Sequence, residues 1–228
     1  MDGTIQNVLS SEGYVVTTSL REKYRGAGRP QNVCTATKSG VTYYAFNVRT
    51  SDCIHDHAGH YQRIRTIQDS IPRMARMVGP FEDVVLLEAA HGHLLWDLDK
   101  APDPAIVEAQ LIEFAVGTRK NQLIHGDLRP WNVFFDNERG VQVIDWWCLS
   151  SFVDDLLPRG VLPARRADLL GQGHYVKFHP ELVAQGKLTE IDQEDARRIG
   201  KLLRGDIGLS EAWRPIYQIS PRPAWCKP

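Results

Sequence analysis

Residues 125–132 read His-Gly-Asp-Leu-Arg-Pro-Trp-Asn, and residues 143–146 read Val-Ile-Asp-Trp. Asp127 lies five residues before Asn132 and eighteen residues before Asp145. A carboxylate in such a loop is a candidate base for an attacking hydroxyl, and the amide and the second carboxylate are candidate oxygen ligands for magnesium. The spacing therefore indicates phosphoryl transfer, a chemistry that depends on positioning and on charge neutralisation.

The composition is that of an ordinary soluble globular protein. The 228 residues are 43% hydrophobic and 24% charged, and a chain of this length forms one domain or two small lobes. The net charge of −1 argues against nucleic acid or an anionic membrane as the main partner. No apolar run is long enough to span a bilayer and the first residues lack the pattern of a secretion signal, so we expect no membrane span.

The four cysteines are widely spaced and form no Cys-x-x-Cys pair: Cys34, Cys53, Cys148 and Cys226. A disulfide framework or a zinc knuckle is therefore not expected. A reducing compartment is the simpler interpretation, and it predicts a cytoplasmic protein.

The first part of the chain is rich in short runs of Val, Thr and Tyr, which predict strands over residues 14–19, 33–37 and 42–48. Lys38-Ser39-Gly40 predicts a hairpin turn between the second and third of these strands. Helical spacing of isoleucines predicts a helix over residues 56–70.

Helical patterns and further short strands follow. Val84–Glu88 predicts an apolar strand, and residues 89–92 read as a connector. Residues 104–118 have helical spacing with Asp103 as the N-cap. Short strands are predicted at Leu123–Ile124, 133–135 and 141–144. We expect an α+β fold with a β-rich part over residues 1–88 and a mostly helical part over residues 89–228.

The opening segment resembles the catalytic loop and metal-binding aspartate of the protein-kinase-like superfamily, which read His-x-Asp-Leu-Lys/Arg-Pro-x-Asn and then Asp-Phe-Gly. All six defined positions of the eight-residue pattern match. The resemblance implies a bilobal kinase fold with a shortened helical lobe, and ATP and Mg²⁺ as cofactors. It makes Asp127 the catalytic base, Arg129 the group that neutralises the transferring phosphate, and Asn132 and Asp145 the metal ligands.

The glycine-rich loop of that superfamily has a weaker counterpart over residues 26–33, with Gln31 at the third glycine. Residues 43–47 fall where the family has Val-Ala-Ile-Lys, so Asn47 stands at the usual lysine. No glutamate occurs between Glu22 and Glu82 to pair with such a lysine. Arg49 or Lys38 would supply the missing cation. The implied nucleotide-binding residues are Gly26, Gly28, Val33, Ala45, Arg49 and Lys38, with Glu88 and Ala90 at the hinge.

Two later segments resemble the protein-kinase branch. His179-Pro180-Glu181 resembles the Ala-Pro-Glu that closes an activation segment, and residues 195–200 resemble the Asp-x-x-x-x-Gly at the start of the central large-lobe helix. In that family the aspartate holds the backbone of the catalytic loop, which gives this role to Asp195. Gly126 replaces an arginine common in regulated protein kinases, so we expect activity without activation-loop phosphorylation.

The leading interpretation is a minimal ATP- and Mg²⁺-dependent kinase that phosphorylates serine or threonine on a protein substrate. Such small kinases occur among bacterial and phage proteins, including effectors delivered into a host cytosol. The alternative is a small-molecule kinase similar to the aminoglycoside and choline phosphotransferases, whose loops also read His-Gly-Asp. A third hypothesis is a catalytically inactive kinase fold that regulates a binding partner. Transfer of AMP instead of phosphate is a related option.

Overall fold

A computed structural model describes residues 3–19, 33–47, 57–82, 84–144, 151–152, 179–212 and 223–226. The chain forms two compact units, and each is described by itself. Unit 1 consists of Met1–Asp69 and Ala75–Ala90, and unit 2 consists of Ser70–Met74 and His91–Pro228. The division thus falls two residues after the expected boundary at residue 88, and a short piece before β4 belongs to unit 2.

Unit 1 is built on an antiparallel sheet with the strand order β1-β2-β3-β5-β4. Its strands are β1 (Val15–Ser19), β2 (Val33–Lys38), β3 (Val41–Asn47), β4 (Met77–Phe81) and β5 (Val84–Glu88). The three predicted strands before residue 50 and the strand over Val84–Glu88 are confirmed. Strand β4 was not predicted, because its Gly79-Pro80 pair is untypical of a strand interior.

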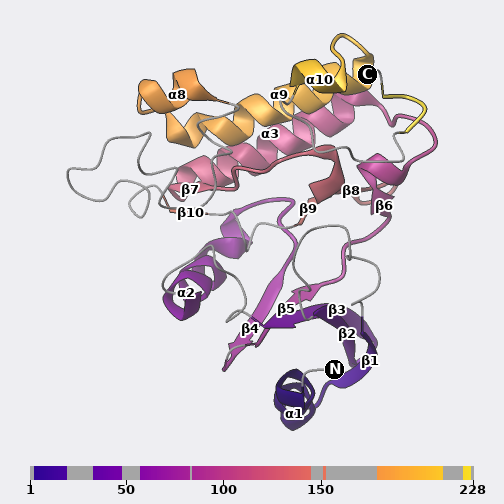
Figure 1. The fold of residues 1–228 in the computed structure, drawn as a ribbon, viewed down its shortest axis with the longest axis vertical. Helices are drawn as coiled ribbons and strands as arrows, with labels where there is room; N and C mark the ends of the chain where they lie inside the picture. Colours follow the sequence, from indigo (N-terminus) through magenta and orange to yellow (C-terminus); the bar gives the residue numbers. More distant parts are fainter. Residues whose placement is uncertain are drawn as a thin grey trace. The chain divides into compact units, whose positions relative to one another are not determined.

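A helix that the sequence analysis did not predict covers one face of this sheet. Helix α1 (Gly3–Ser11) packs against β1, β3 and β5 (Figure 1). Ile5, Val8 and Leu9 lie on one stripe of α1 because they are three and four residues apart, and all three are buried. They form one core with residues of the sheet: Tyr14, Cys34, Ala36, Ala45, Val84 and Leu86.

Helix α2 (His57–Ile67) and the 3₁₀ turn η2 (Gln68–Ser70) confirm the helix predicted over residues 56–70. Buried Gln68 joins this turn to β4. Its Nε2 donates to the Met77 carbonyl at 3.1 Å, and its Oε1 accepts from the Met77 amide at 2.8 Å. The two bonds satisfy both polar ends of a side chain that is 9% exposed.

Unit 2 is organised around α3 (Pro104–Lys120) and α9 (Ile191–Arg204), which run side by side (Figure 1). Asp103 caps α3 as predicted, since its Oδ1 accepts from the Ala105 amide at 2.8 Å. Gly200 allows the close approach of the helices, because a Cβ there would meet the Glu108 side chain. Shorter helical segments are η3 (Leu95–Asp97), η4 (Pro130–Asn132), α8 (Pro180–Ala184), η5 (Leu188–Glu190) and α10 (Leu209–Ala212).

Two small antiparallel sheets complete unit 2. One has the order β6-β8-β9, with β6 (His93–Leu94), β8 (Val133–Asp136) and β9 (Gly140–Val143). The other pairs β7 (Leu123–Ile124) with β10 (Ser151–Phe152). Strands β7, β8 and β9 confirm the predicted positions around the opening motif, whereas β6 and β10 were not predicted.

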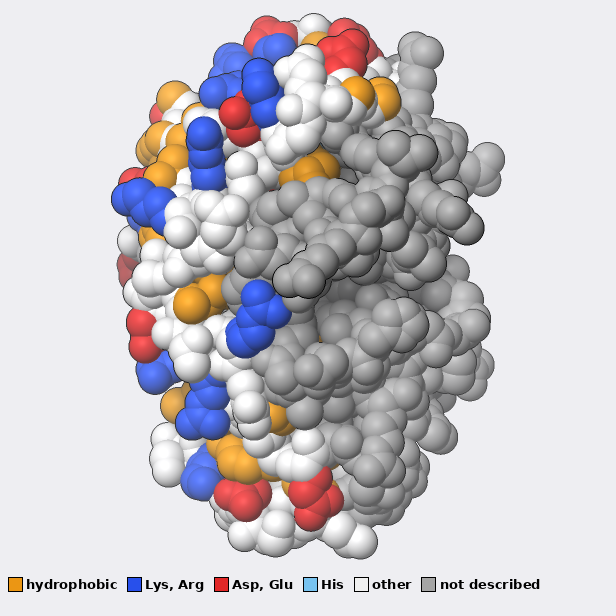
Figure 2. Space-filling model, turned by 90° about the vertical axis from the view of Figure 1, so that its left-hand side faces the viewer, with side chains coloured by type: hydrophobic (Ala, Val, Ile, Leu, Met, Phe, Trp, Pro, Cys, Tyr) orange, Lys and Arg blue, Asp and Glu red, His pale blue; other side chains and the backbone are white. Residues whose placement is uncertain are grey.

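The α+β class predicted from the sequence is confirmed by this order of an antiparallel sheet followed by helices. Within the described residues, no helix is both long and apolar enough to cross a membrane. On the face drawn in Figure 2, basic and acidic side chains are interspersed over the described surface.

Candidate active site

The loop of residues 125–132 connects β7 to β8 in unit 2 and lies almost entirely in the interior. His125 is fully buried, and Asp127, Arg129 and Asn132 are 9%, 5% and 3% exposed. Polar groups in such a position require partners, because an unsatisfied buried polar group is costly. The contacts of this loop therefore define what it can do.

Asp127 and Asn132 are joined directly. The Asn132 Nδ2 donates to Asp127 Oδ2 at 2.9 Å and to the Asp127 carbonyl at 2.8 Å. Both protons of the amide are thus used, which fixes its orientation and turns Oδ1 into the atom available to a metal ion. The two residues that the sequence analysis assigned as base and ligand form one rigid group.

Arg129 faces the other oxygen of the same carboxylate. Its Nε lies 2.6 Å from Asp127 Oδ1, and both side chains are largely buried. The N–H does not point along this line, so the contact is an ion pair without hydrogen-bond geometry. Oδ1 of Asp127 is buried beside Arg129 and accepts no hydrogen bond within the described residues, so its lone pairs are not used by a hydrogen-bond donor there.

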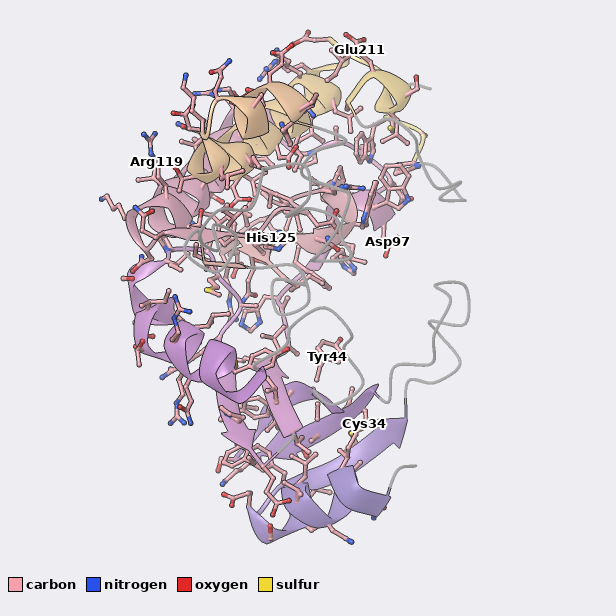
Figure 3. All side chains as sticks on the ribbon, turned by 60° about the vertical axis from the view of Figure 1, so that its left-hand side comes forward. Cys34, Tyr44, Asp97, Arg119, His125 and Glu211 are labelled. Carbon is pink, nitrogen blue, oxygen red and sulfur yellow. The ribbon has the colours of Figure 1, made fainter. Side chains whose placement is uncertain are left out.

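His125 holds the loop in place from within unit 2 (Figure 3). Its Nε2 lies 2.9 Å from the Ile144 carbonyl, and its Nδ1 accepts from the Asp127 amide at 3.2 Å. These partners assign the neutral tautomer that carries its proton on Nε2, because a carbonyl can only accept. With both ring nitrogens engaged in this way, we interpret His125 as a residue that holds the loop in place rather than as an acid or a base.

Asp192, in the first turn of α9, anchors the backbone of the loop. Its Oδ2 accepts from the His125 amide and from the Thr118 hydroxyl, and its Oδ1 accepts from the Gly126 amide, all at 2.9 Å. Asp192 is 2% exposed. Burial raises the pKa of its carboxyl, against the opposing effects of His125 and of these hydrogen bonds.

The role expected for Asp195 is therefore wrong, since Asp192 performs it. Asp195 lies one turn further along α9, and its Oδ1 instead pairs with His179 Nε2 at 2.9 Å. Both members of that pair are buried. The two aspartates are three residues apart on one helix, and the sequence alone does not say which one reaches the loop.

The backbone conformation at position 126 favours glycine. Its φ is +76°, a conformation that side-chain-bearing residues adopt only with strain. A glycine in place of the arginine common in regulated protein kinases thus avoids strain at this φ.

Two nucleotide-binding residues predicted in unit 1 have other contacts. The Lys38 Nζ donates to the Glu12 carbonyl at 2.6 Å and lies 4.6 Å from the centroid of the Tyr14 ring. Lys38 also ends β2, whereas the predicted glycine-rich loop would precede the start of that strand. The strand separates the two places and the ammonium is engaged, so these contacts argue against a nucleotide-binding role for Lys38, which stays a prediction.

Ala45 is fully buried in the core between the sheet and α1. Its neighbour Tyr44 points to the opposite face, as alternation along a strand requires (Figure 3). Packing against α1 argues against a nucleotide contact at Ala45, and its nucleotide-binding role also stays a prediction.

The predicted hinge residues lie at the end of β5. The Glu88 amide donates to the Arg76 carbonyl at 2.8 Å, and the Ala89 amide donates to the Thr42 carbonyl at 2.9 Å. The adenine-binding roles of Glu88 and Ala90 stay predictions, as does that of Val33, the first residue of β2. Gly26, Gly28, Arg49 and the predicted metal ligand Asp145 lie outside the described residues.

Magnesium fits the donors of the loop. It prefers oxygen ligands from carboxylates and carbonyls, and the oriented Asn132 Oδ1 is such a ligand. The Ile144 amide donates to the Asn132 carbonyl at 2.9 Å, which fixes the residue before Asp145 against the loop. The described residues hold no group of three or more His, Cys, Asp or Glu side chains suited to a metal.

A comparison with protein families agrees with phosphoryl transfer as the chemistry of this segment. Residues 55–151 match the phosphotransferase enzyme family, APH. The segment that contains the loop is thus similar to kinase-like phosphotransferases. The kinase PK-1 of Cydia pomonella granulovirus is similar in structure, with a TM-score of 0.43 and 19% identity over 67% of this chain. This chain covers 58% of PK-1, and at that TM-score the likeness adds nothing on individual residues. No curated protein matches the chain.

Proposed function

We propose that the protein transfers the γ-phosphate of ATP to a hydroxyl group with Asp127 as the base. The observation that supports this proposal is that the two carboxylate oxygens of Asp127 have different partners. One of its oxygens is held by Asn132 at 2.9 Å, and the other faces Arg129 without accepting a hydrogen bond. A base with one oxygen fixed by an amide and one oxygen that accepts no hydrogen bond suits proton transfer from the hydroxyl of a positioned acceptor.

Each residue of the loop has a separate role in the proposed reaction. Asp127 Oδ1 accepts the proton of the attacking hydroxyl. Arg129 places a positive charge next to the phosphoryl group while it is transferred. Asn132 and Asp145 would hold Mg²⁺, which when bound neutralises charge on the phosphates of ATP. Asp192 keeps the loop rigid through the amides of His125 and Gly126.

A small-molecule hydroxyl is the acceptor that we favour. Gly126 adopts its φ of +76° in a His-Gly-Asp loop, the form shared with small-molecule phosphotransferases. The two features that favoured a protein acceptor receive little support from the described residues. Asp192 rather than Asp195 accepts the described hydrogen bonds from the loop amides, and Glu181 is exposed.

A protein serine or threonine hydroxyl is the second candidate. It is favoured by α8, which begins at Pro180 directly after buried His179, where the resemblance to Ala-Pro-Glu predicted the end of an activation segment.

An assay with labelled ATP distinguishes a small-molecule acceptor from a protein acceptor. The protein is incubated with [γ-³²P]ATP, Mg²⁺ and either casein and myelin basic protein or a panel of aminoglycosides, choline and simple alcohols. We expect label in a small-molecule product and none in the proteins, with Asp127→Asn as the blank. Label in the protein substrates alone would reverse the order of the candidates. Asp127-independent label would contradict the assignment of the base.

A further inference from the structure

Three tryptophans from distant parts of the sequence form a row in unit 2. The rings of Trp131 and Trp96 lie 5.5 Å apart at 88°, and those of Trp96 and Trp225 lie 6.2 Å apart at 78°. Both contacts are edge-to-face, the arrangement that aromatic rings prefer. Trp131 belongs to η4 of the loop, Trp96 to η3, and Trp225 to the segment of residues 223–226 near the C-terminus. These three residues are called the tryptophan row.

The far end of the row is tied to the protein backbone. The Trp225 Nε1 donates to the Leu98 carbonyl at 2.9 Å, just after η3. Cys226, the next residue, is 3% exposed. Trp96, the middle ring, is 6% exposed and packs against η4 through η3. The segment near the C-terminus is thus fixed against the element that carries Trp96.

The near end of the row meets the catalytic loop. The Arg129 guanidinium carbon lies 5.6 Å from the centroid of the Trp131 ring, within the range of a cation–π contact. The same side chain lies 2.6 Å from Asp127. Arg129 is therefore held between an aromatic ring and the carboxylate of the base.

Arginine has many rotamers, and ordering it costs conformational entropy. A rigid ring on one side of the guanidinium reduces the conformations that compete with the ion pair. A ring that is itself fixed by two further rings does so more strongly than a solitary, partly exposed tryptophan.

We infer that Trp96 and Trp225 are positioning residues that hold Trp131 and, through it, Arg129 against Asp127. The segment of residues 223–226 thereby becomes part of the active site's support, although it lies more than ninety residues from the loop in the sequence. This inference rests on the proposed function for its catalytic consequence, but its structural part is measurable without any activity.

The structural test observes the Arg129 side chain directly. The Nε–H signals of the ¹⁵N-labelled protein are recorded by NMR, and Arg129→Lys identifies the signal of Arg129. In Trp225→Ala we expect this signal to shift and broaden. In Trp225→Phe, which keeps a ring but loses the bond to Leu98, the change is smaller. Tyr14→Ala is the matched control, since Tyr14 makes a similar edge-to-face contact with Tyr43 at 5.5 Å in unit 1.

The outcomes are decisive in either direction. An Arg129 signal that is the same in Trp225→Ala and in the unchanged protein overturns the inference, as does an equal change in Tyr14→Ala. If Trp225→Ala does not fold, Trp96→Phe is measured in its place against the same control. There the ring contact is weakened without a cavity as large as alanine leaves, and an unchanged signal again overturns the inference.

The catalytic test is a double-mutant cycle. Trp225→Ala should lower kcat about 5- to 10-fold with little change in the KM for ATP, because positioning acts on the reacting groups. In the Arg129→Ala background the same change should have less than about a twofold effect. An equal loss in both backgrounds indicates a general structural role and contradicts the inference. If the unchanged protein transfers no phosphate, the proposed function fails while the NMR result still decides on the row.

Discussion

The catalytic loop of unit 2 and the β2–β3 region of unit 1 carry their predicted residues in different ways. In the loop, Asp127, Arg129 and Asn132 contact one another, and the backbone is held by a buried aspartate. In unit 1, Lys38 and Ala45 are engaged in packing with α1 and the turn that follows it. The difference teaches that, among the described residues, contacts within unit 2 already hold the predicted catalytic side chains together. The predictions below change one side of this comparison at a time.

Removal of the base is expected to have the largest effect. Asp127→Asn keeps the shape of the side chain but not its basicity, and should lower the rate of phosphate transfer about 10²- to 10⁴-fold. The rate is measured in single turnover with labelled ATP. Asp136→Asn is the control, because Asp136 lies on the β8–β9 turn and an asparagine still accepts from the Glu138 and Arg139 amides. A loss of the same size in the control would show that the assay does not report on the base.

Asp192 and Asp195 offer a matched pair on one helix. Asp192→Asn places an NH₂ group against an amide donor, and should lower the free energy of unfolding by about 1–3 kcal/mol and reduce transfer as well. Asp195→Asn still accepts from His179 and should cost about 1 kcal/mol or less, with transfer retained. Urea unfolding and the transfer rate are measured for both. A larger loss of activity in Asp195→Asn would restore the original assignment.

Gly126→Ala tests the geometry of the loop. An alanine at φ +76° should lower the free energy of unfolding by about 1–2 kcal/mol, because of its left-handed backbone. Gly186→Ala is the control with φ +71° and no atom near its added Cβ. Thermal unfolding should show similar losses for the two variants, but only Gly126→Ala should slow phosphate transfer. Equal activity in both would mean that the loop tolerates the distortion.

Lys38→Met should have the smallest effect. It removes a cation–π contact and one hydrogen bond at the surface of unit 1, worth about 1 kcal/mol or less. The KM for ATP should stay within about twofold of the original value, measured by steady-state kinetics. A tenfold rise in that KM would return Lys38 to the nucleotide site and weaken the contrast between the two regions.

Local patterns in the sequence were sufficient to predict α3 and the strands β7, β8 and β9 near the loop. The Asp103 cap, the helical spacing of α3 and the short strands β7, β8 and β9 all depend on neighbouring residues. The pairing of Asp127 with Asn132 also follows from a motif of eight residues. These features could be predicted because each is set within one segment of the chain.

Some of the features that were missed depend on packing between distant segments, whereas α1 had a local signal. The spacing of Ile5, Val8 and Leu9 is helical, but α1 was missed because strand patterns dominate the sequence that follows it. The assignment of Asp192 requires knowledge of how α9 meets the loop, and the tryptophan row joins residues 96, 131 and 225. No spacing in the sequence encodes such contacts.

The central claim is that the loop of residues 125–132 transfers the terminal phosphate of ATP. Its most direct test is a parallel incubation with [γ-³²P]ATP and [α-³²P]ATP in the presence and absence of Mg²⁺, with Asp127→Asn beside the unchanged protein. We predict that label from the γ-position moves to an acceptor or to water, and that the movement requires both Mg²⁺ and Asp127. Transfer of label from the α-position, or transfer that Asp127→Asn leaves intact, would contradict the account.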